Sequence, residues 1–184
     1  QVWEPSTDVF VIGPLNSIGR YIGQYSHTFS RATMQGGFVP YSLYRPEVAL
    51  DKFEGKQSIA TFNLNGDVEG AKAFLAAPMP RRMVGKNVCH TVVFDKAQFA
   101  TFAPPRCRAA ELFHEAANLY FAKHDSKKFH DPIAAVCHLH PEVGTWIKGK
   151  TVRVKGEWTT IPGDDDILVD IDREKAWEYL RTMT

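Results

Sequence analysis

The sequence predicts an α/β fold with a largely parallel central sheet flanked by helices. The segment Asp8–Ile12 is a short, nearly continuous apolar run, and Gly13-Pro14 ends it before a helical pattern over residues 16–25. A buried strand that leads through a glycine turn into a helix is typical of parallel sheets. Strand and helix patterns then alternate along most of the chain, which favours the same architecture. The 184 residues suffice for one domain with a sizeable core.

The composition is that of an ordinary globular protein. Apolar residues make up 44% of the chain, charged residues 23%, and the formal net charge is +1. We therefore expect no nucleic-acid partner and no attraction to acidic membranes, and no apolar run approaches the ~20 residues that span a bilayer. The three cysteines, Cys89, Cys107 and Cys137, are widely spaced and odd in number. This pattern favours a reducing compartment such as the cytoplasm over a disulfide framework.

The first half of the chain adds one short strand, a long loop and one helix. The strand, Ala32–Met34, runs toward the Gly36-Gly37 pair. Residues 38–62 show no clear periodicity, and a loop of this length in a compact domain is usually functional or wrapped over a site. The helix is predicted over Asp67–Ala76, with Asp67 as its N-cap.

The second half continues the alternation of helices and strands. Apolar spacing predicts helices over Arg108–Lys123, Pro132–Leu139 and Arg173–Met183, and strands over Arg82–Val88, Lys150–Thr160 and Ile167–Ile171. Polar and apolar residues alternate in Lys150–Thr160, so we expect a half-exposed strand or hairpin there. The acidic run Asp164–Asp166 is expected in a loop.

The strongest local motif is His130-Asp131-Pro132, which precedes an apolar helix. One interpretation is structural: Asp131 caps a helix whose first residue is Pro132, because proline has no N–H to lose at that position. A functional interpretation is compatible with this one, since a carboxylate at a helix start can bind a hard cation and His130 can exchange a proton near neutral pH. A second pair, His124-Asp125, lies in a polar stretch that we expect to be a solvated surface turn.

Two asparagines, Asn63 and Asn65, stand just before the helix predicted from Asp67. Turn chemistry followed by an N-cap accounts for them structurally. Alternatively, an asparagine side chain offers both a donor and an acceptor, which suits the hydroxyl groups of a sugar. The local pattern leaves both interpretations open.

Five segments follow one another in an order that carries a family resemblance. They are Val11–Ile18, similar to the motif GPLTNIA; Met34–Gly37, similar to MGG; Phe62–Ala71, similar to EFNxxxDPEAA; Met83–His90, similar to MVGLDVTH; and His130–Pro132, similar to HDP. Together they resemble the inosine–uridine type nucleoside hydrolases over nearly the whole chain. Each motif is weak alone, but five in the right order are hard to obtain by chance.

The resemblance implies a hydrolase that cleaves the N-glycosidic bond of ribonucleosides. In this family a tightly bound Ca²⁺ holds the attacking water and the ribose diol, and the transition state resembles an oxocarbenium ion. Carried onto this chain, Asp131 and the backbone carbonyl of Ile12 would be calcium ligands. His130 would act as a general acid near the leaving base, Asn63 would bind the ribose, and Tyr120 would line the base pocket.

Two departures from the family pattern concern the 5′ end of the ribose. The family's glutamate two residues before the asparagine is Thr61 here, and an asparagine that follows a glycine is Lys56. One hypothesis is that the substrate is modified or phosphorylated at its 5′ position, because the point charge of a lysine suits phosphate. The alternative is a subfamily difference that involves no phosphate.

A larger departure is the absence of the family's aspartate cluster, DxDxxxDD, from this sequence. In the family this cluster supplies most of the calcium carboxylates and the base that activates water. We therefore expect residues 1–184 to be the C-terminal part of a single nucleoside hydrolase domain. Its complement would be an N-terminal chain or segment that carries the cluster. Gln1 in place of an initiator methionine agrees with this expectation, and the family also implies an oligomer.

Three functions remain open from the sequence. The chain is an enzyme that acts together with its complement, or a non-catalytic module that binds nucleoside or ribose on the same fold. The third alternative is an unrelated α/β domain with chance motifs, in which no cleft would lie beside His130.

Overall fold

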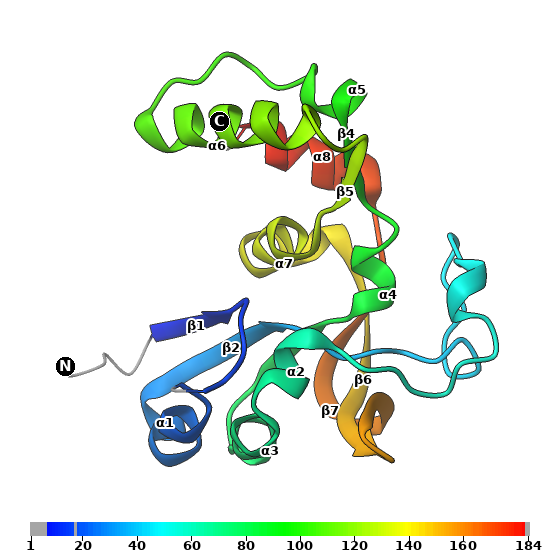
Figure 1. Cartoon of the computed structure of the whole chain (residues 1–184). Helices are drawn as coiled ribbons and strands as arrows, with labels where there is room; N and C mark the ends of the chain where they lie inside the picture. The colour runs from blue at the N-terminus through cyan, green and yellow to red at the C-terminus, as the bar shows by residue number, and fades with distance from the viewer. Residues whose placement is uncertain (1–6, 17, 183–184) are drawn as a thin grey trace.

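The computed structural model describes residues 7–16 and 18–182 and has a five-stranded sheet as its centre (Figure 1). The strands lie in the order β1 (Thr7–Val11), β2 (Phe29–Gln35), β3 (Arg81–Val84), β7 (Glu157–Ile171) and β6 (Gly144–Val154). The first four are mutually parallel, and only β6 runs antiparallel, against β7. The predicted α/β fold with a largely parallel sheet is confirmed.

One face of the sheet is covered by α1 (Ile18–Tyr25) and α3 (Val68–Ala76). Val9 and Val11 of β1 are buried on this side together with apolar residues of both helices. Asp67 caps α3 as predicted, since its Oδ1 accepts a hydrogen bond of 3.0 Å from the backbone N–H of Gly70. A short helix that the sequence did not indicate, α2 (Phe62–Gly66), precedes α3.

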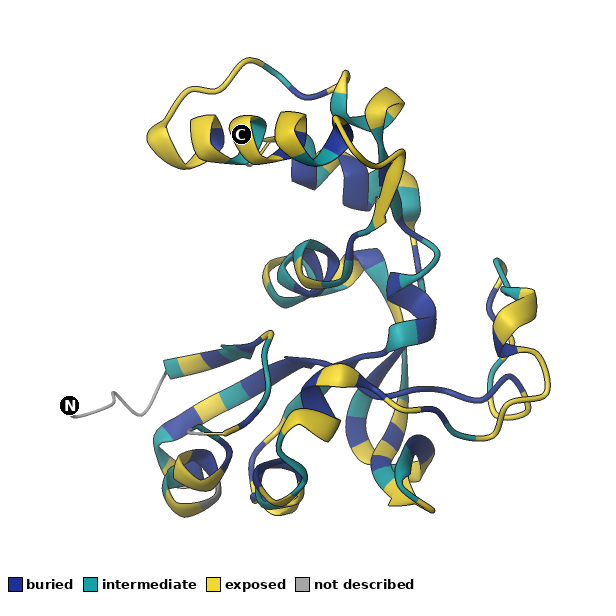
Figure 2. Cartoon of the chain, viewed as in Figure 1, coloured by how far each residue is buried: buried dark blue, intermediate teal, exposed yellow. Residues whose placement is uncertain are grey.

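The other face carries α4 (Lys86–Cys89), α7 (His130–Leu139) and α8 (Arg173–Thr182). Beyond them, a group of elements projects from the sheet, and we call this group the arm. It consists of β4 (Val93–Asp95), α5 (Lys96–Phe99), α6 (Arg108–Phe121) and β5 (Ser126–Lys128). In Figures 1 and 2, α6 stands well apart from β1, and most of its surface is exposed. Only Ala110, Ala117 and Phe121 of α6 are buried.

The last two strands form a hairpin that is longer than predicted. Its turn is Lys155-Gly156, with φ of 49° and 90°. Two consecutive residues with positive φ make the tight turn whose twist matches that of antiparallel strands, and glycine adopts this conformation without a steric cost.

The strand predicted over Arg82–Val88 is wrong in its second half, because β3 ends at Val84 and α4 begins at Lys86. Residues 126–128 also differ from the predicted surface turn, since they form β5 against β4.

The acidic run Asp164–Asp166 lies inside β7, so its assignment to a loop was wrong. Asp165 is buried and forms an ion pair of 3.0 Å with Arg81, whose side chain is only 11% exposed. Arg81 also donates to the backbone carbonyl oxygens of Phe74 and Ala77. Arg81, on the neighbouring strand β3, therefore neutralises the charge of Asp165, which the local sequence would place in solvent.

Two predicted elements include residues outside those described, namely Ser17 near the start of α1 and Met183 after α8. Across 7–16 and 18–182, none of the helices combines the length and the apolar character needed to cross a membrane.

The ion pair within the sheet predicts a difference between neighbouring aspartates. Asp165→Ala should lower the free energy of unfolding by about 3–5 kcal/mol, because it leaves the Arg81 guanidinium buried without its counter-charge. Asp164→Ala, at an exposed position one residue away, should change it by less than about 0.5 kcal/mol. Urea denaturation of both variants measures the difference, and equal effects would contradict a structural role for the pair.

Candidate active site

The carboxyl ends of parallel strands meet at one edge of the sheet, where a cavity of about 350 Å³ lies. Ile12 follows β1, Gln35 ends β2, and the first turns of α2 and α7 close the cavity. Its lining residues are Ile12, Gly13, Pro14, Gln35, Phe62, Asn63, Lys127, Lys128, Phe129, His130, Asp131 and Pro132. Four of the residues predicted from the sequence therefore meet in one place: Ile12, Asn63, His130 and Asp131.

The His130-Asp131-Pro132 motif forms the first turn of α7. The helix begins at His130, with Phe129 as its N-cap and no side-chain capping bond. The prediction that Asp131 caps a helix starting at Pro132 is therefore wrong. Because the Asp131 carboxylate is not used as a cap, it is available to the cavity that it lines. The helix start itself adds partial positive charge at this point.

Two hydrogen bonds to Gln35 hold the side chain of Asn63. Its Nδ2 donates to the backbone oxygen of Gln35 at 2.9 Å and to Gln35 Oε1 at 2.8 Å. A carbonyl oxygen can only accept, so the amide orientation of Asn63 is fixed. Both of its N–H donors are used, which leaves its Oδ1 as the group that can accept a hydrogen bond from a ligand.

The same network continues to His130 through a buried thiol. Gln35 Nε2 donates to Cys89 Sγ at 3.9 Å, and Cys89 Sγ donates to the backbone oxygen of His130 at 3.8 Å. Burial raises the pKa of Cys89 to about 12, so the sulfur keeps its proton near neutral pH. Asn63 on α2 and His130 on α7 are thus connected through β2 and α4.

A second histidine lies beside His130. The rings of His90 and His130 have centroids 4.8 Å apart and are tilted by 55°. Lys52 Nζ, from the long loop, contacts His90 Nδ1. Burial, followed by the charge of Lys52, lowers the pKa of His90 to about 3. Burial also lowers the pKa of His130, although Asp131 opposes this shift, and both rings are therefore mainly uncharged at pH 7.

The metal-binding capacity of this chain is limited. Partial burial raises the pKa of Asp131, while His130 and Lys127 act in the opposite direction. The carboxylate of Asp131 and the carbonyl of Ile12 are oxygen donors of the kind that calcium binds, but calcium takes about six to eight oxygens. Among the described residues, no group of three or more His, Cys, Asp or Glu could hold a metal ion. These residues alone therefore do not form a calcium site.

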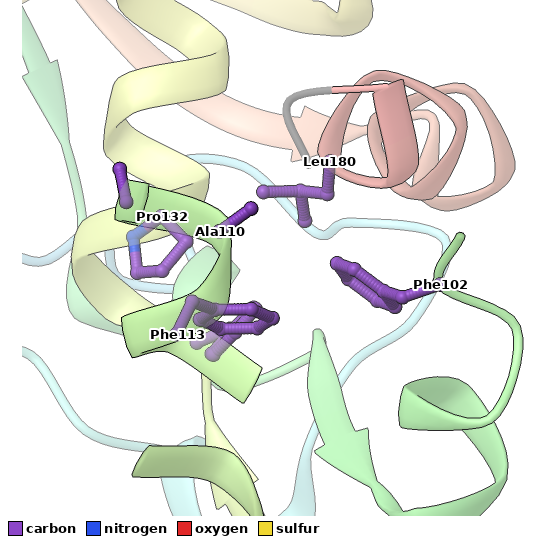
Figure 3. A pocket seen from close by; sticks show the side chains of 7 residues that line it. Phe102, Ala110, Phe113, Pro132 and Leu180 are labelled. Carbon is purple, nitrogen blue, oxygen red and sulfur yellow. The ribbon is translucent and has the colours of Figure 1, made fainter. Parts of the chain in front are cut away.

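Two apolar pockets adjoin the cavity on the side of the arm. One has a volume of about 330 Å³ and is lined by Phe94, Phe113, Ala116, Ala117, Tyr120, Lys127, Phe129 and Pro132. The other, of about 200 Å³, lies between α6, α7 and α8 (Figure 3). Phe129 and Pro132 line both pockets and the polar cavity, so the start of α7 separates a polar compartment from an apolar one.

Comparison with known families identifies the chain. The profile described as inosine-uridine preferring nucleoside hydrolase matches residues 4–178. This chain belongs to that family. A search of curated proteins found no match.

Solved structures of nucleoside hydrolases share the fold. A plant nucleoside hydrolase, PpNRh1, has a TM-score of 0.69 at 17% identity, over 97% of this chain and 61% of its own. A purine-preferring ribonucleoside hydrolase from Gardnerella vaginalis has a TM-score of 0.68 at 15% identity, over 95% of this chain and 59% of its own. An inosine-uridine preferring nucleoside hydrolase from Bacillus anthracis has a TM-score of 0.69 at 13% identity, over 100% of this chain and 61% of its own. The chain thus spans about three fifths of the length of these nucleoside hydrolases.

The structure places the other predicted site residues outside the cavity. Thr61 is buried, 3% exposed, and does not line it. Lys56 is exposed on the long loop and does not line it either. Tyr120 lines the neighbouring apolar pocket, and its hydroxyl donates to the backbone oxygen of Ser126 at 3.2 Å.

Sequence reasoning missed several residues of the site. Gln35 could have been found, because it stands immediately before Gly36-Gly37 at the end of a parallel strand, where ligands usually bind. Lys127 and Lys128 directly precede Phe129 and His130, so they were within reach of the same motif. Nothing in the local sequence indicates that Lys52 approaches His90, because the two are 38 positions apart.

The Gln35–Asn63 contact can be tested without knowledge of the substrate. In Gln35→Met, Asn63 loses one of its two acceptors, and the free energy of unfolding should fall by about 1–2 kcal/mol. The side-chain amide protons of Asn63 should also exchange faster with water, as measured by NMR. Gln24→Met, on the exposed face of α1, is the matched control and should change neither quantity. Unaltered exchange at Asn63 in the Gln35 variant would show that Gln35 does not hold it.

Proposed function

We propose that this chain contributes to the hydrolysis of the N-glycosidic bond of ribonucleosides, with part of the active site on the chain itself. The observation that carries the proposal is the meeting of Ile12, Asn63, His130 and Asp131 in one cavity. These residues come from three separate parts of the sequence, and each lies in a segment that resembles a motif of the family to which the chain belongs.

Asn63 is suited to recognise the sugar. The remaining polar atom of its side chain, Oδ1, accepts hydrogen bonds, so the side chain selects a ligand group that donates one. A ribose hydroxyl is such a group. Binding costs the Asn63 side chain little conformational entropy, since Gln35 already fixes its orientation.

The leaving base would occupy the apolar side of the cavity. The pocket of about 330 Å³ shares Lys127, Phe129 and Pro132 with the polar cavity, and its aromatic lining suits the flat face of a base. Tyr120 belongs to this pocket. His130 lines the polar cavity beside Phe129 and Pro132, which both compartments share. After its ring takes up a proton from water, the imidazolium would give that proton to the base nitrogen as the bond breaks.

Calcium is the cofactor that we propose, with Asp131 and the Ile12 carbonyl as two of its ligands. When bound, the ion would supply a water of lowered pKa and hold vicinal hydroxyls. The remaining oxygen ligands would come from a complementary segment rich in carboxylates. Two features support such a complement. Among residues 7–16 and 18–182, β1 pairs only with β2, and Phe62 and Ile12 at the cavity are 81% and 44% exposed.

A reducing compartment such as the cytoplasm suits this protein. All three cysteines are unpaired, and two of them, Cys89 and Cys137, are buried.

Ribose release from inosine and uridine tests the proposal, with the chain assayed alone and with its complement at varied calcium concentrations. His130→Ala should lower kcat by about 10²-fold or more, because a positioned acid contributes about that factor. Asp131→Ala should weaken calcium binding measured by calorimetry. His27→Ala and Asp125→Ala, at exposed positions outside the cavity, are the matched controls and should retain both properties.

The outcomes separate the two functions that the family allows. If neither His130→Ala nor Asp131→Ala changes a measured activity, the assignment of the site is wrong. Binding of nucleoside without ribose release, at saturating calcium and with the complement present, would instead establish a non-catalytic binding module. The small set of metal ligands on this chain is the observation that favours that second candidate.

A further inference from the structure

Four lysines gather around the two histidines of the site. Lys127 and Lys128, on β5, line the cavity. Lys52, on the long loop, contacts His90, whose ring lies against that of His130. Lys86 begins α4, and its Nζ donates to the backbone oxygen of Ala60 at 3.2 Å. The four cations thus come from three separate segments and surround one side of the site, and are called the lysine cluster below.

The charge of the lysine cluster is not balanced by nearby carboxylates. Among the described residues, none of the four lysines takes part in an ion pair. Within the part of the chain that the structure describes, Asp131 is the one carboxylate that lines the cavity, against two lysines there. Burial and the charges of Lys128 and Lys86 lower the pKa of Lys52, which shows mutual repulsion within the cluster.

Repulsion of this kind costs free energy unless a negative charge binds. The start of α7 points its partial positive charge into the same cavity and adds to the potential. Thr61, which is buried and neutral, also adds no negative charge beside Phe62 and Asn63.

We infer that the ligand of this site is a phosphorylated ribosyl compound, in which Asn63 binds a sugar hydroxyl and the lysine cluster binds the phosphate. This inference rests on the proposed function and names its substrate class. The two side-chain contacts are chemically distinct, because the Asn63 side chain presents only an acceptor and does not bind a phosphate oxygen, whereas lysine side chains present only donors. In the sequence hypothesis Lys56 bound the phosphate. Here Lys127 and Lys128, which line the cavity, take that place together with Lys52 and Lys86, whose charges act on His90 and His130.

Binding of three small probes to this chain tests the inference by calorimetry or NMR titration. Ribose 5-phosphate should bind at least about 10-fold more tightly than ribose, which corresponds to about 1.4 kcal/mol. Inorganic phosphate should bind more weakly than ribose 5-phosphate, because it lacks the hydroxyl contact. The advantage of ribose 5-phosphate over ribose should shrink as salt is raised, since it depends on charge.

Variants assign the effect to the lysine cluster. Lys52→Gln and Lys86→Gln should each weaken ribose 5-phosphate binding several-fold and leave ribose binding unchanged. Lys155→Gln, at the exposed turn of the β6–β7 hairpin, is the matched control and should alter neither. Circular dichroism of each variant verifies that it is folded.

Equal binding of ribose and ribose 5-phosphate, or equal binding of phosphate and ribose 5-phosphate, would overturn the inference. In the first case the lysines would instead serve to pair with carboxylates of the complementary segment. The failure of the proposed function is distinguishable from both outcomes. Lysine-dependent binding of ribose 5-phosphate, without cleavage of any nucleoside or nucleoside 5′-monophosphate when calcium and the complement are present, would retain the phosphate site and reject the hydrolase.

Discussion

The parallel register of the first four strands is the constraint on which the site depends. Val11 pairs with Met34, Met34 with Met83, and Val84 with Leu168, so β1, β2 and β3 end side by side. The residues at the carboxyl ends of these three strands therefore lie at the same edge of the sheet. A shift of one residue in this register would turn Gln35 toward the opposite face, since side chains alternate along a strand. The cavity lies at this edge because the segment after β1, the end of β2 and the first turns of α2 and α7 meet there.

A buried hydrogen-bond network at this edge of the sheet fixes the side chains of the site. Gln35 is the link, because it accepts from Asn63 and donates to Cys89, which in turn donates to the backbone of His130. Each such bond contributes only about 0.5–1.5 kcal/mol, but an unpaired partner in this buried place would cost more. The network therefore favours one orientation of Asn63, and this orientation determines that the sugar contact is an acceptor.

The sequence predicted those parts that depend on local patterns. The apolar run before Gly13 and the capping residue Asp67 were identified correctly because strand, turn and cap signals lie within a few residues. The strand over residues 82–88 was half wrong, since Val88 and Cys89 are apolar and suit a buried helix equally well. Asp165 was misplaced because its counter-charge, Arg81, is 84 positions away. For the same reason the family motifs indicated Asn63 and His130 but not the lysine cluster, whose members meet only in three dimensions.

NMR mapping of ribonucleoside binding on the isotopically labelled chain shows where the sugar binds. We expect the backbone amides with the largest shifts to cluster at Gly13, Asn63 and Asp131, where the strand ends meet the start of α7. Shifts confined to the outer surface of α6 or to the β6–β7 hairpin would contradict this expectation, because the sugar would then bind away from the edge that the parallel strands create.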